Sequence, residues 1–579
     1  MSRGFTIPKS PVRFSLELLL IMAIATAILL RIINLGSREF WYDEVLSLLL
    51  STGQKIAYQG PGDSPKVLAD YTPLLSLPGE KRIPDILKTA INLLRGLAGG
   101  EPHPPLFFLG QHLWLRLFGN SVAAVRSLGV CFSVGAIASA FGLGRILLGQ
   151  RGGLLFAALL AINPYYLFHS LNVRMYGPVI FWIILSAWGL LELIGIQRSG
   201  ENEQGQQEKF VNSKFRTETG RSSLQNSTLL WSLLLIASVA AGLMTLYFFA
   251  YWLIAIAILV LCLNRSRWWQ HGLRLAAGVL LTIPWALWGT RQQLRNADLD
   301  RFSTSTGIVE TGLRHLQDVL QTLGIHLVLG DWITSLPPVS ALVAGGVATL
   351  VLLVCSISLW RQNQRRVLVV ALLLGILPLL LGLAVDVVGG KFTIGFGWGR
   401  SMIFILPGCL LLVAAWIERA AGQWQRPAAA VLLLLYLSIS IADFSTRHRW
   451  MFHEMAEIIK QDSTTPTLIA MNSQAWGHVL RLAYYIPPTS PVMLLAQKSA
   501  QLAPALKKAL SSKPDHYQRI LWLDSTRPVW GSPSTEAERQ QVQQVLEGQF
   551  QLKKKQQLSG TMNIDQFTAH LYQRSASNP

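Results

Sequence analysis

Long apolar runs separated by short polar loops dominate the pattern along the chain. About 17–25 apolar residues in a helix are enough to cross a bilayer. The pattern predicts 11 such spans and therefore a mainly α, polytopic membrane protein. The predicted spans are 14–34, 122–148, 152–171, 173–195, 228–244, 246–263, 270–290, 338–360, 366–388, 400–420 and 426–444.

The basic residues give these spans an orientation, because lysine and arginine concentrate in cytoplasmic loops. With the N-terminus in the cytoplasm, the inside loops contain most of the arginines, whereas the short outer turns near 172 and 245 contain only Arg174. An odd number of spans then places the C-terminal domain outside the cytoplasm. The first apolar run is longer than the core of a signal peptide and lacks a cleavage site, so we expect an uncleaved span.

Three polar stretches interrupt the spans. Residues 35–121 are predicted to form the first extracytoplasmic loop (the first loop below), and 291–337 form a second outer loop. Residues 196–227 are polar and of mixed charge, which is typical of a flexible linker, here cytoplasmic. Residues 1–444 would then form the transmembrane domain.

The tail, 445–579, differs from the rest of the chain in its pattern. Helix-like stretches at 451–459 and 536–546 alternate with the strand-like stretches TLIAMNS, RILWLDS and FTAHLYQR. We therefore expect a small extracytoplasmic α/β domain.

Residues 104–118 are apolar but short for a span. Counting them as one would invert every later loop and place Arg145 and Arg151 outside. The segment is therefore predicted to be an interfacial or re-entrant helix, and the first loop is expected to contain interfacial helices.

Composition supports a membrane protein and excludes other classes. The chain is 51% hydrophobic and 14% charged, whereas soluble domains carry about 25% charged residues. The net charge is +19, but the basic residues lie mostly in the short loops between the spans, as is typical of a membrane protein. No nucleic-acid partner is therefore expected. All four cysteines lie in apolar runs without metal-ligand spacing, and no glycine-rich phosphate loop follows a strand. These patterns predict no metal site and no nucleotide cofactor.

Two adjacent carboxylates, Asp43 and Glu44, follow the first span in SREFWYDEVLSLLL. In a helix, Trp41 and Val45 share an apolar face and Asp43 lies roughly opposite. One interpretation is an interfacial helix whose apolar face lies in the lipid and whose carboxylate lies on the aqueous side. The alternative is that both acids stabilise the positive first turn of a helix.

Other polar residues are predicted on the same membrane face: His103, Arg174, Tyr176, Tyr247, Lys391 and Arg400. Each has a structural alternative, such as snorkelling, an aromatic belt or a turn before proline. Together they predict a cavity with a carboxylate and at least two guanidiniums. Arginine forks bind phosphate, and a carboxylate can deprotonate an incoming hydroxyl. Transfer from an activated lipid carrier is consistent with this set.

The ordered motifs FWYDE, HPPLFFLGQHLWLRLFG and LNVRMYG resemble the GT-C superfamily of integral-membrane glycosyltransferases. The similar branch contains protein O-mannosyltransferases and lipid A aminoarabinose transferases. The resemblance covers residues 14–190 best and is weaker to 444, where RSMIFILP is similar to an Arg-Tyr segment before proline. It implies inverting transfer of a sugar from a polyprenyl phosphate to a protein, lipid or glycan hydroxyl. We expect this at the outer face of a bacterial cytoplasmic membrane.

The resemblance also implies residue roles. Asp43 matches the catalytic carboxylate, a general base, with Glu44 supporting it. Arg174 and Arg400 would bind the lipid phosphate, and His103 would shape the cavity floor. The expected substrate-binding set is completed by Tyr176, Tyr247 and Lys391.

The sequence departs from the family pattern at several positions. Asn172-Val173 replaces a frequent Glu-Ala pair, Leu246 a frequent histidine and Met402 the usual tyrosine. The missing glutamate leaves dependence on a divalent cation open. Two other functions also stay open: a polytopic transporter or flippase, and a non-catalytic assembly partner with a GT-C fold.

Overall fold

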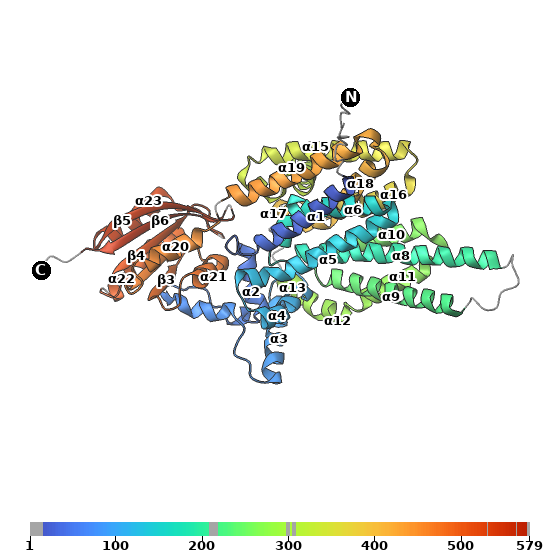
Figure 1. Cartoon of the computed structure of the whole chain (residues 1–579). Helices are drawn as coiled ribbons and strands as arrows, with labels where there is room; N and C mark the ends of the chain where they lie inside the picture. The colour runs from blue at the N-terminus through green and yellow to red at the C-terminus, as the bar shows by residue number, and fades with distance from the viewer. Residues whose placement is uncertain are drawn as a thin grey trace, which may run out of the picture.

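The computed structural model describes residues 15–207, 218–296, 302–303, 308–447, 449–513, 515–529, 531–562 and 564–575. Long helices lie side by side in a bundle, and the C-terminal domain packs against one end of it (Figure 1). The mainly helical fold with a small C-terminal sheet domain is confirmed. The helices of the bundle are α1 (Leu16–Ile33), α5 (Val122–Leu148), α6 (Gln150–Ile162), α7 (Pro164–Ser170), α8 (Tyr176–Gln207), α9 (Glu218–Leu243), α10 (Phe249–Leu263), α11 (Trp268–Leu280), α15 (Val339–Arg361), α16 (Arg365–Gly389), α18 (Leu406–Arg419) and α19 (Gln425–Thr446).

Within the described residues, eight helices are long and apolar enough to cross a membrane, or up to ten if each of two bent pairs is one span. The prediction of 11 is consistent with this number but is not confirmed by it. One bent pair is α6 with α7, which meet at 64°. The bend falls at Asn163-Pro164, where proline disfavours a helical conformation of the preceding residue. The other pair is α10 with η3 (Arg265–Arg267) and α11, at 114°.

The predicted linker 196–227 is shorter than expected. Helices α8 and α9 extend into it from both sides, to Gln207 and from Glu218, because glutamine, glutamate and arginine are good helix formers. The rest of the predicted linker lies outside the described residues.

The first loop contains separate helices at the end of the bundle nearest the C-terminal domain (Figure 1). The segment predicted to be a short helix is α4 (Leu106–Phe118), with 13 residues. The other elements of this loop are α2 (Tyr42–Ser51), η1 (Lys55–Ala57), β1 (Lys66–Val67), η2 (Leu68–Leu75) and α3 (Ile83–Ala98).

Short helices connect the remaining long ones. Between α11 and α15 they are α12 (Ile283–Trp285), η4 (Ala286–Thr290), α13 (Arg291–Asn296), α14 (Ile308–Gly324), η6 (Ile325–Leu329) and η7 (Gly330–Ser335). Further along the chain they are α17 (Phe396–Gly399), η8 (Arg400–Ile405) and η9 (Gly422–Trp424).

The C-terminal domain is built on a six-stranded sheet of order β1-β3-β2-β4-β6-β5. Strands β2, β3 and β4 are parallel, and β5 and β6 form an antiparallel hairpin beside β4. The three strand-like stretches and two helix-like stretches predicted in the tail are confirmed. The elements are α20 (Met451–Lys460), β2 (Thr467–Met471), α21 (Trp476–Tyr485), β3 (Val492–Ala496), α22 (Ser499–Ser512), β4 (Arg519–Ser525), α23 (Glu536–Glu547), β5 (Phe550–Ser559) and β6 (Gln566–Arg574).

One strand of this sheet comes from the first loop. Strand β1 pairs antiparallel with β3, with Lys66 opposite Leu494. The backbone of Phe40 is also held by the C-terminal domain, since its N–H donates to Tyr485 Oη (2.7 Å). Helix α21 approaches α2 so closely that a Cβ at Gly477 would lie 2.6 Å from the Tyr42 ring. The segment that contains Asp43 is therefore fixed between the bundle and the C-terminal domain.

Candidate active site

Glu44 lies at the start of α2 and is fully buried, at 0% exposure. Its carboxylate accepts two hydrogen bonds from Arg126, at 2.9 and 2.7 Å. It also accepts the backbone N–H groups of Trp41 (2.7 Å) and Val173 (3.0 Å). These four bonds occupy both oxygens of the carboxylate and hold Glu44 in place. Its supporting catalytic role stays a prediction.

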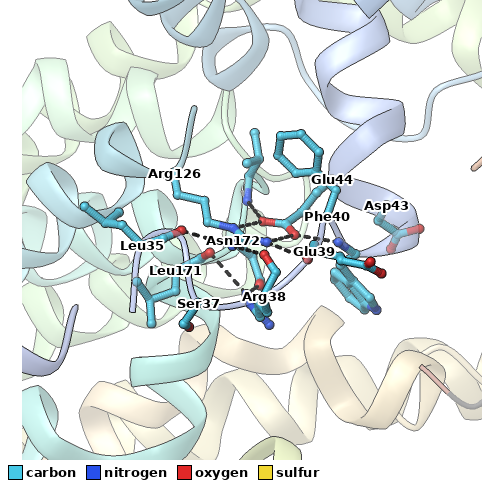
Figure 2. A network of polar contacts seen from close by, with 12 residues as sticks. Leu35, Ser37, Arg38, Glu39, Phe40, Asp43, Glu44, Arg126, Leu171 and Asn172 are labelled. Atoms are coloured by element: carbon cyan, nitrogen blue, oxygen red, sulfur yellow. Dashed lines mark hydrogen bonds and ion pairs between the residues drawn. The ribbon is translucent and has the colours of Figure 1, made fainter. Parts of the chain in front are cut away.

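Arg126 extends this network to the chain before α2. Its guanidinium donates to the carbonyls of Leu35, Arg38 and Glu39, at 2.8–3.0 Å. Arg38 in turn donates to Leu171 O (3.1 Å) and to the side chain of Asn172. Figure 2 shows these residues joining the turn after α1 to the turn before α8.

Asp43 points away from this network, on another side of α2 (Figure 2). Its side chain is 16% exposed, and Oδ2 accepts a hydrogen bond from Arg400 Nη1 at 2.6 Å. Burial alone raises the pKa of Asp43. The charges of Arg400 and Arg174, with the hydrogen bond from Arg400, outweigh that effect and hold the pKa below its usual value. Asp43 is therefore an ionised carboxylate at neutral pH.

Arg174 lies in the turn before α8, close to the pair of Asp43 and Arg400. These residues and their neighbours are called the cluster below. Arg174 Nη1 donates to Ser47 Oγ (3.0 Å), one helical turn after Asp43, and Arg174 Nη2 lies 4.0 Å from Glu101 Oε1. Arg400 lies over the Tyr176 ring, 5.8 Å from its centroid. The structure therefore brings together four of the predicted residues, Asp43, Arg174, Tyr176 and Arg400.

His103 joins the cluster through Glu101, to which its Nδ1 is hydrogen-bonded. Burial lowers the pKa of His103 more than Glu101 raises it. A neutral His103 then donates its Nδ1–H to an ionised Glu101, whose own pKa is lowered by His103 and Arg174 against the effect of burial. The histidine ring also packs edge-on to Tyr176, at 6.3 Å between centroids.

Two predicted residues make their contacts elsewhere. Tyr247 Oη donates to Gln293 Oε1 (2.5 Å), and Gln293 donates to His103 O (2.9 Å), so Tyr247 reaches the cluster through an intermediate side chain. Lys391 donates to Ser303 Oγ (2.5 Å), a contact that does not involve the cluster.

The predicted site did not include Glu101, Ser47 or Arg126. Glu101 could have been found as a carboxylate two residues before His103 in EPHPP, and Ser47 as the residue one turn after Asp43. Arg126 gave no such signal, because it lies in a predicted span and its partner is distant in sequence.

The acids that could take part in binding a cation at this cluster are Asp43 and Glu101. Within the described part of the chain, no three His, Cys, Asp or Glu side chains form a group that could hold a metal ion. A divalent cation would therefore need oxygen ligands from a substrate, such as a phosphate, beside these two acids.

A family model described as dolichyl-phosphate-mannose-protein mannosyltransferase matches residues 102–200. This range includes His103, Arg174 and Tyr176. No curated protein matches the sequence significantly.

Several solved structures are similar at low identity. The Archaeoglobus fulgidus oligosaccharyltransferase has a TM-score of 0.46 and 11% identity, over 88% of this chain and 68% of that chain. ArnT from Cupriavidus metallidurans, bound to undecaprenyl phosphate, has a TM-score of 0.40 and 13% identity, over 96% and 98%. Similarities of this size do not assign a function.

The chain is a multi-pass membrane protein that resembles the GT-C membrane glycosyltransferases, and the family-model match confirms the resemblance seen in the motifs. The match supports a general assignment as a glycosyltransferase.

Proposed function

We propose that the protein transfers a sugar from a polyprenyl phosphate to an acceptor hydroxyl, with inversion at the anomeric carbon. The observation that carries the proposal is the pair of Asp43 and Arg400, with Arg174 in the same cluster. An ionised carboxylate beside two arginines provides a base for the acceptor and a binding site for the leaving phosphate.

In the proposed reaction, Asp43 accepts the proton of the acceptor hydroxyl as its oxygen attacks the anomeric carbon. The bond from that carbon to the phosphate oxygen breaks, and the phosphate leaves with the electron pair. Arg400 binds Asp43 through Nη1, and its charge would also attract the leaving phosphate. Arg174 adds a second positive charge beside the leaving group.

The same proposal includes location and partners. Helix α2, which contains Asp43, lies at the end of the bundle next to the C-terminal domain (Figure 1), and the positive-inside rule predicts that this end is outside the cytoplasm. We propose a cytoplasmic N-terminus, a bacterial inner membrane and a lipid-linked donor that enters from the bilayer. The acceptor is a protein, lipid or glycan.

The test is an assay of purified protein with polyprenyl-phosphate mannose and polyprenyl-phosphate glucose, in which release of polyprenyl phosphate is followed. Loss of general-base catalysis lowers rates about 10²- to 10⁴-fold, so we expect that loss in Asp43→Asn with an unchanged melting temperature. Asp70→Asn, an exposed acid of the same loop, should keep full activity. Full turnover by a folded Asp43→Asn variant would overturn the assignment.

A further inference from the structure

Residues 395–399, GFGWG, come directly before Arg400 and are called the glycine turn below. Gly397, Trp398 and Gly399 are three consecutive residues with left-handed backbone, at φ of +57°, +61° and +75°. Such a backbone at a residue other than glycine costs of order 1–3 kcal/mol and persists only where the surrounding structure holds it. Trp398 and Arg400 also form part of the wall of a cavity of about 260 Å³ between the bundle and the C-terminal domain. The position of Arg400 therefore depends on what holds the glycine turn.

The side chain of Arg400 folds back over the glycine turn. A Cβ at Gly397 would lie 2.5 Å from Arg400 Nε, so a larger residue there would displace the guanidinium. In its present position the guanidinium donates to Asp43 Oδ2 (2.6 Å) and lies over the Trp41 ring, 5.4 Å from the ring centroid. The contact with Asp43 is therefore set by the backbone that precedes Arg400.

The glycine turn also packs closely against α14. A Cβ at Gly399 would lie 2.7 Å from Thr322 Oγ1, so glycine is needed for this approach. Two hydroxyls contact this part of the backbone at the long end of hydrogen-bond distance. Thr322 Oγ1 lies 3.4 Å from Ile394 O, and Tyr165 Oη lies 3.4 Å from Trp398 O. These two bonds are weak, so they do not account for a strained turn held in one place.

His326 of η6 makes a shorter bond to the last carbonyl of the turn. Its side chain is 0% exposed, and Nε2 lies 3.0 Å from Gly399 O. Because a carbonyl oxygen can only accept, Nε2 carries the proton. The ring stacks on Tyr165, at 4.3 Å between centroids, and His326 O accepts a bond from Asn163 Nδ2 (3.0 Å) at the bend between α6 and α7. A chain of hydrogen bonds therefore runs from this bend to the peptide bond before Arg400.

We propose that His326 is a positioning residue, which holds the Gly399 carbonyl and thereby fixes Arg400 where it can bind Asp43 and the leaving phosphate. This inference rests on the proposed function for the roles of Arg400 and Asp43. It extends that function to a histidine that acts through a backbone carbonyl and is separate from the reacting groups.

Loss of the bond from His326 should be visible at Asp43. Burial raises the pKa of Asp43, and Arg400, Arg174 and His103 together lower it below its usual value. Of these three, only Arg400 follows the glycine turn. If the turn loosens and Arg400 withdraws, the pKa of Asp43 rises and the inactive protonated acid persists to higher pH.

The test compares His326→Phe with His326→Gln. Phenylalanine keeps a ring to stack on Tyr165 but has no donor, whereas the glutamine amide can donate from about the position of Nε2. We expect His326→Phe to lower kcat/KM about two- to tenfold, as for the loss of one hydrogen bond, and to move the acidic limb of its pH profile upward. His326→Gln should restore both. His271→Phe, which replaces a buried histidine of α11, should leave the acidic limb in place.

A second measurement does not need turnover. Hydrogen–deuterium exchange of the peptide 392–405 should be several-fold faster in His326→Phe than in the unaltered protein or in His326→Gln, because loosely held backbone exchanges faster. Exchange in α5 should be the same in all three proteins. Where phenylalanine prevents folding, His326→Asn replaces it, since the shorter amide does not reach the Gly399 carbonyl.

Faster exchange together with a shifted acidic limb would support the inference. Unchanged exchange, an unshifted limb in an active His326→Phe enzyme, or failure of His326→Gln to restore the limb would overturn it. If the unaltered protein transfers neither mannose nor glucose, the proposed function fails. The hold of His326 on the glycine turn then stands or falls with the exchange measurement alone.

Discussion

The molecule contains two carboxylate–arginine pairs whose acids are neighbours in the sequence. One pair is buried and the other is partly exposed. The pair of Glu44 and Arg126 is fully buried, and its carboxylate is bonded on both oxygens. The pair of Asp43 and Arg400 is partly exposed, and the arginine retains an N–H without a partner among the described residues. Consecutive helical residues point about 100° apart, which is enough to separate a structural acid from a chemically available one.

The comparison shows that an ion pair alone does not identify a catalytic acid. In the first pair both charges and their backbone contacts are used to join α2, α5 and two turns. In the second pair the arginine is also one of the residues that line a cavity between the bundle and the C-terminal domain. Substitutions should therefore affect stability at one pair and activity at the other.

Arg126→Gln should have the largest effect, and it should act on stability. Removing one partner of a buried ion pair costs about 3–5 kcal/mol, and this arginine also donates to backbone carbonyls. We expect little folded protein, measured by detergent-stable yield and thermal unfolding. Arg151→Gln, from a pair with Glu418 in which the arginine is 43% exposed, should cost about 1 kcal/mol or less. Equal losses of stability in Arg126→Gln and Arg151→Gln would show that burial of the Glu44–Arg126 pair adds nothing to its contribution.

Arg400→Gln should instead act on turnover. Each hydrogen bond to a charged group contributes about 1.5–3 kcal/mol, so loss of the phosphate contact should lower kcat/KM about tenfold to a hundredfold. Solvent can reach Asp43, so the melting temperature should stay close to that of the unaltered protein. A variant that unfolds like Arg126→Gln would show that the second pair is structural as well.

Arg174→Gln should move the pH profile. The charge of Arg174 helps to lower the pKa of Asp43, so its removal raises that pKa, and the inactive protonated acid persists to higher pH. The acidic limb of log kcat/KM against pH should shift upward, with Arg82→Gln, an exposed arginine, as control. An unshifted acidic limb would show that the charge of Arg174 does not influence the pKa of Asp43.

Tyr247→Phe should have the smallest effect. The hydroxyl bonds Gln293, Thr290 and Trp285, and among these described contacts the bond to Gln293 leads to the carbonyl of His103 in the cluster. Loss of a neutral hydrogen bond costs about 0.5–1.5 kcal/mol, so we expect a change in donor KM of less than about tenfold and no change in the pH profile. A larger loss in kcat would place Tyr247 in contact with substrate.

Much of the fold could be predicted because membrane spans and strands each have a local pattern of apolar residues. The spans 14–34 and 122–148 correspond to α1 and α5, and three strand-like stretches of the tail became β2, β4 and β6. Asp43 and Arg400 could be placed on one face of the membrane by topology alone. Their direct contact depends on the packing of η8 against the bundle, which local pattern does not determine.

The features that could not be predicted depend on distant partners. Lys66 and Val67 have no strand pattern of their own, and β1 exists because β3 offers it an edge. The burial of Glu44 follows from Arg126 on another helix. The backbone of Trp398 follows from the glycines beside it and the wall it forms.

The pairing of β1 with β3 constrains how the molecule is made. The first loop is synthesised early, but its edge strand is completed only when the tail has also been synthesised and has folded beside it. A chain that stops after α19 would leave the Phe40 N–H without its tyrosine partner and the segment that carries Asp43 without support on one side. Activity should therefore return when the tail is supplied as a separate polypeptide, as in a split enzyme whose two halves share one sheet.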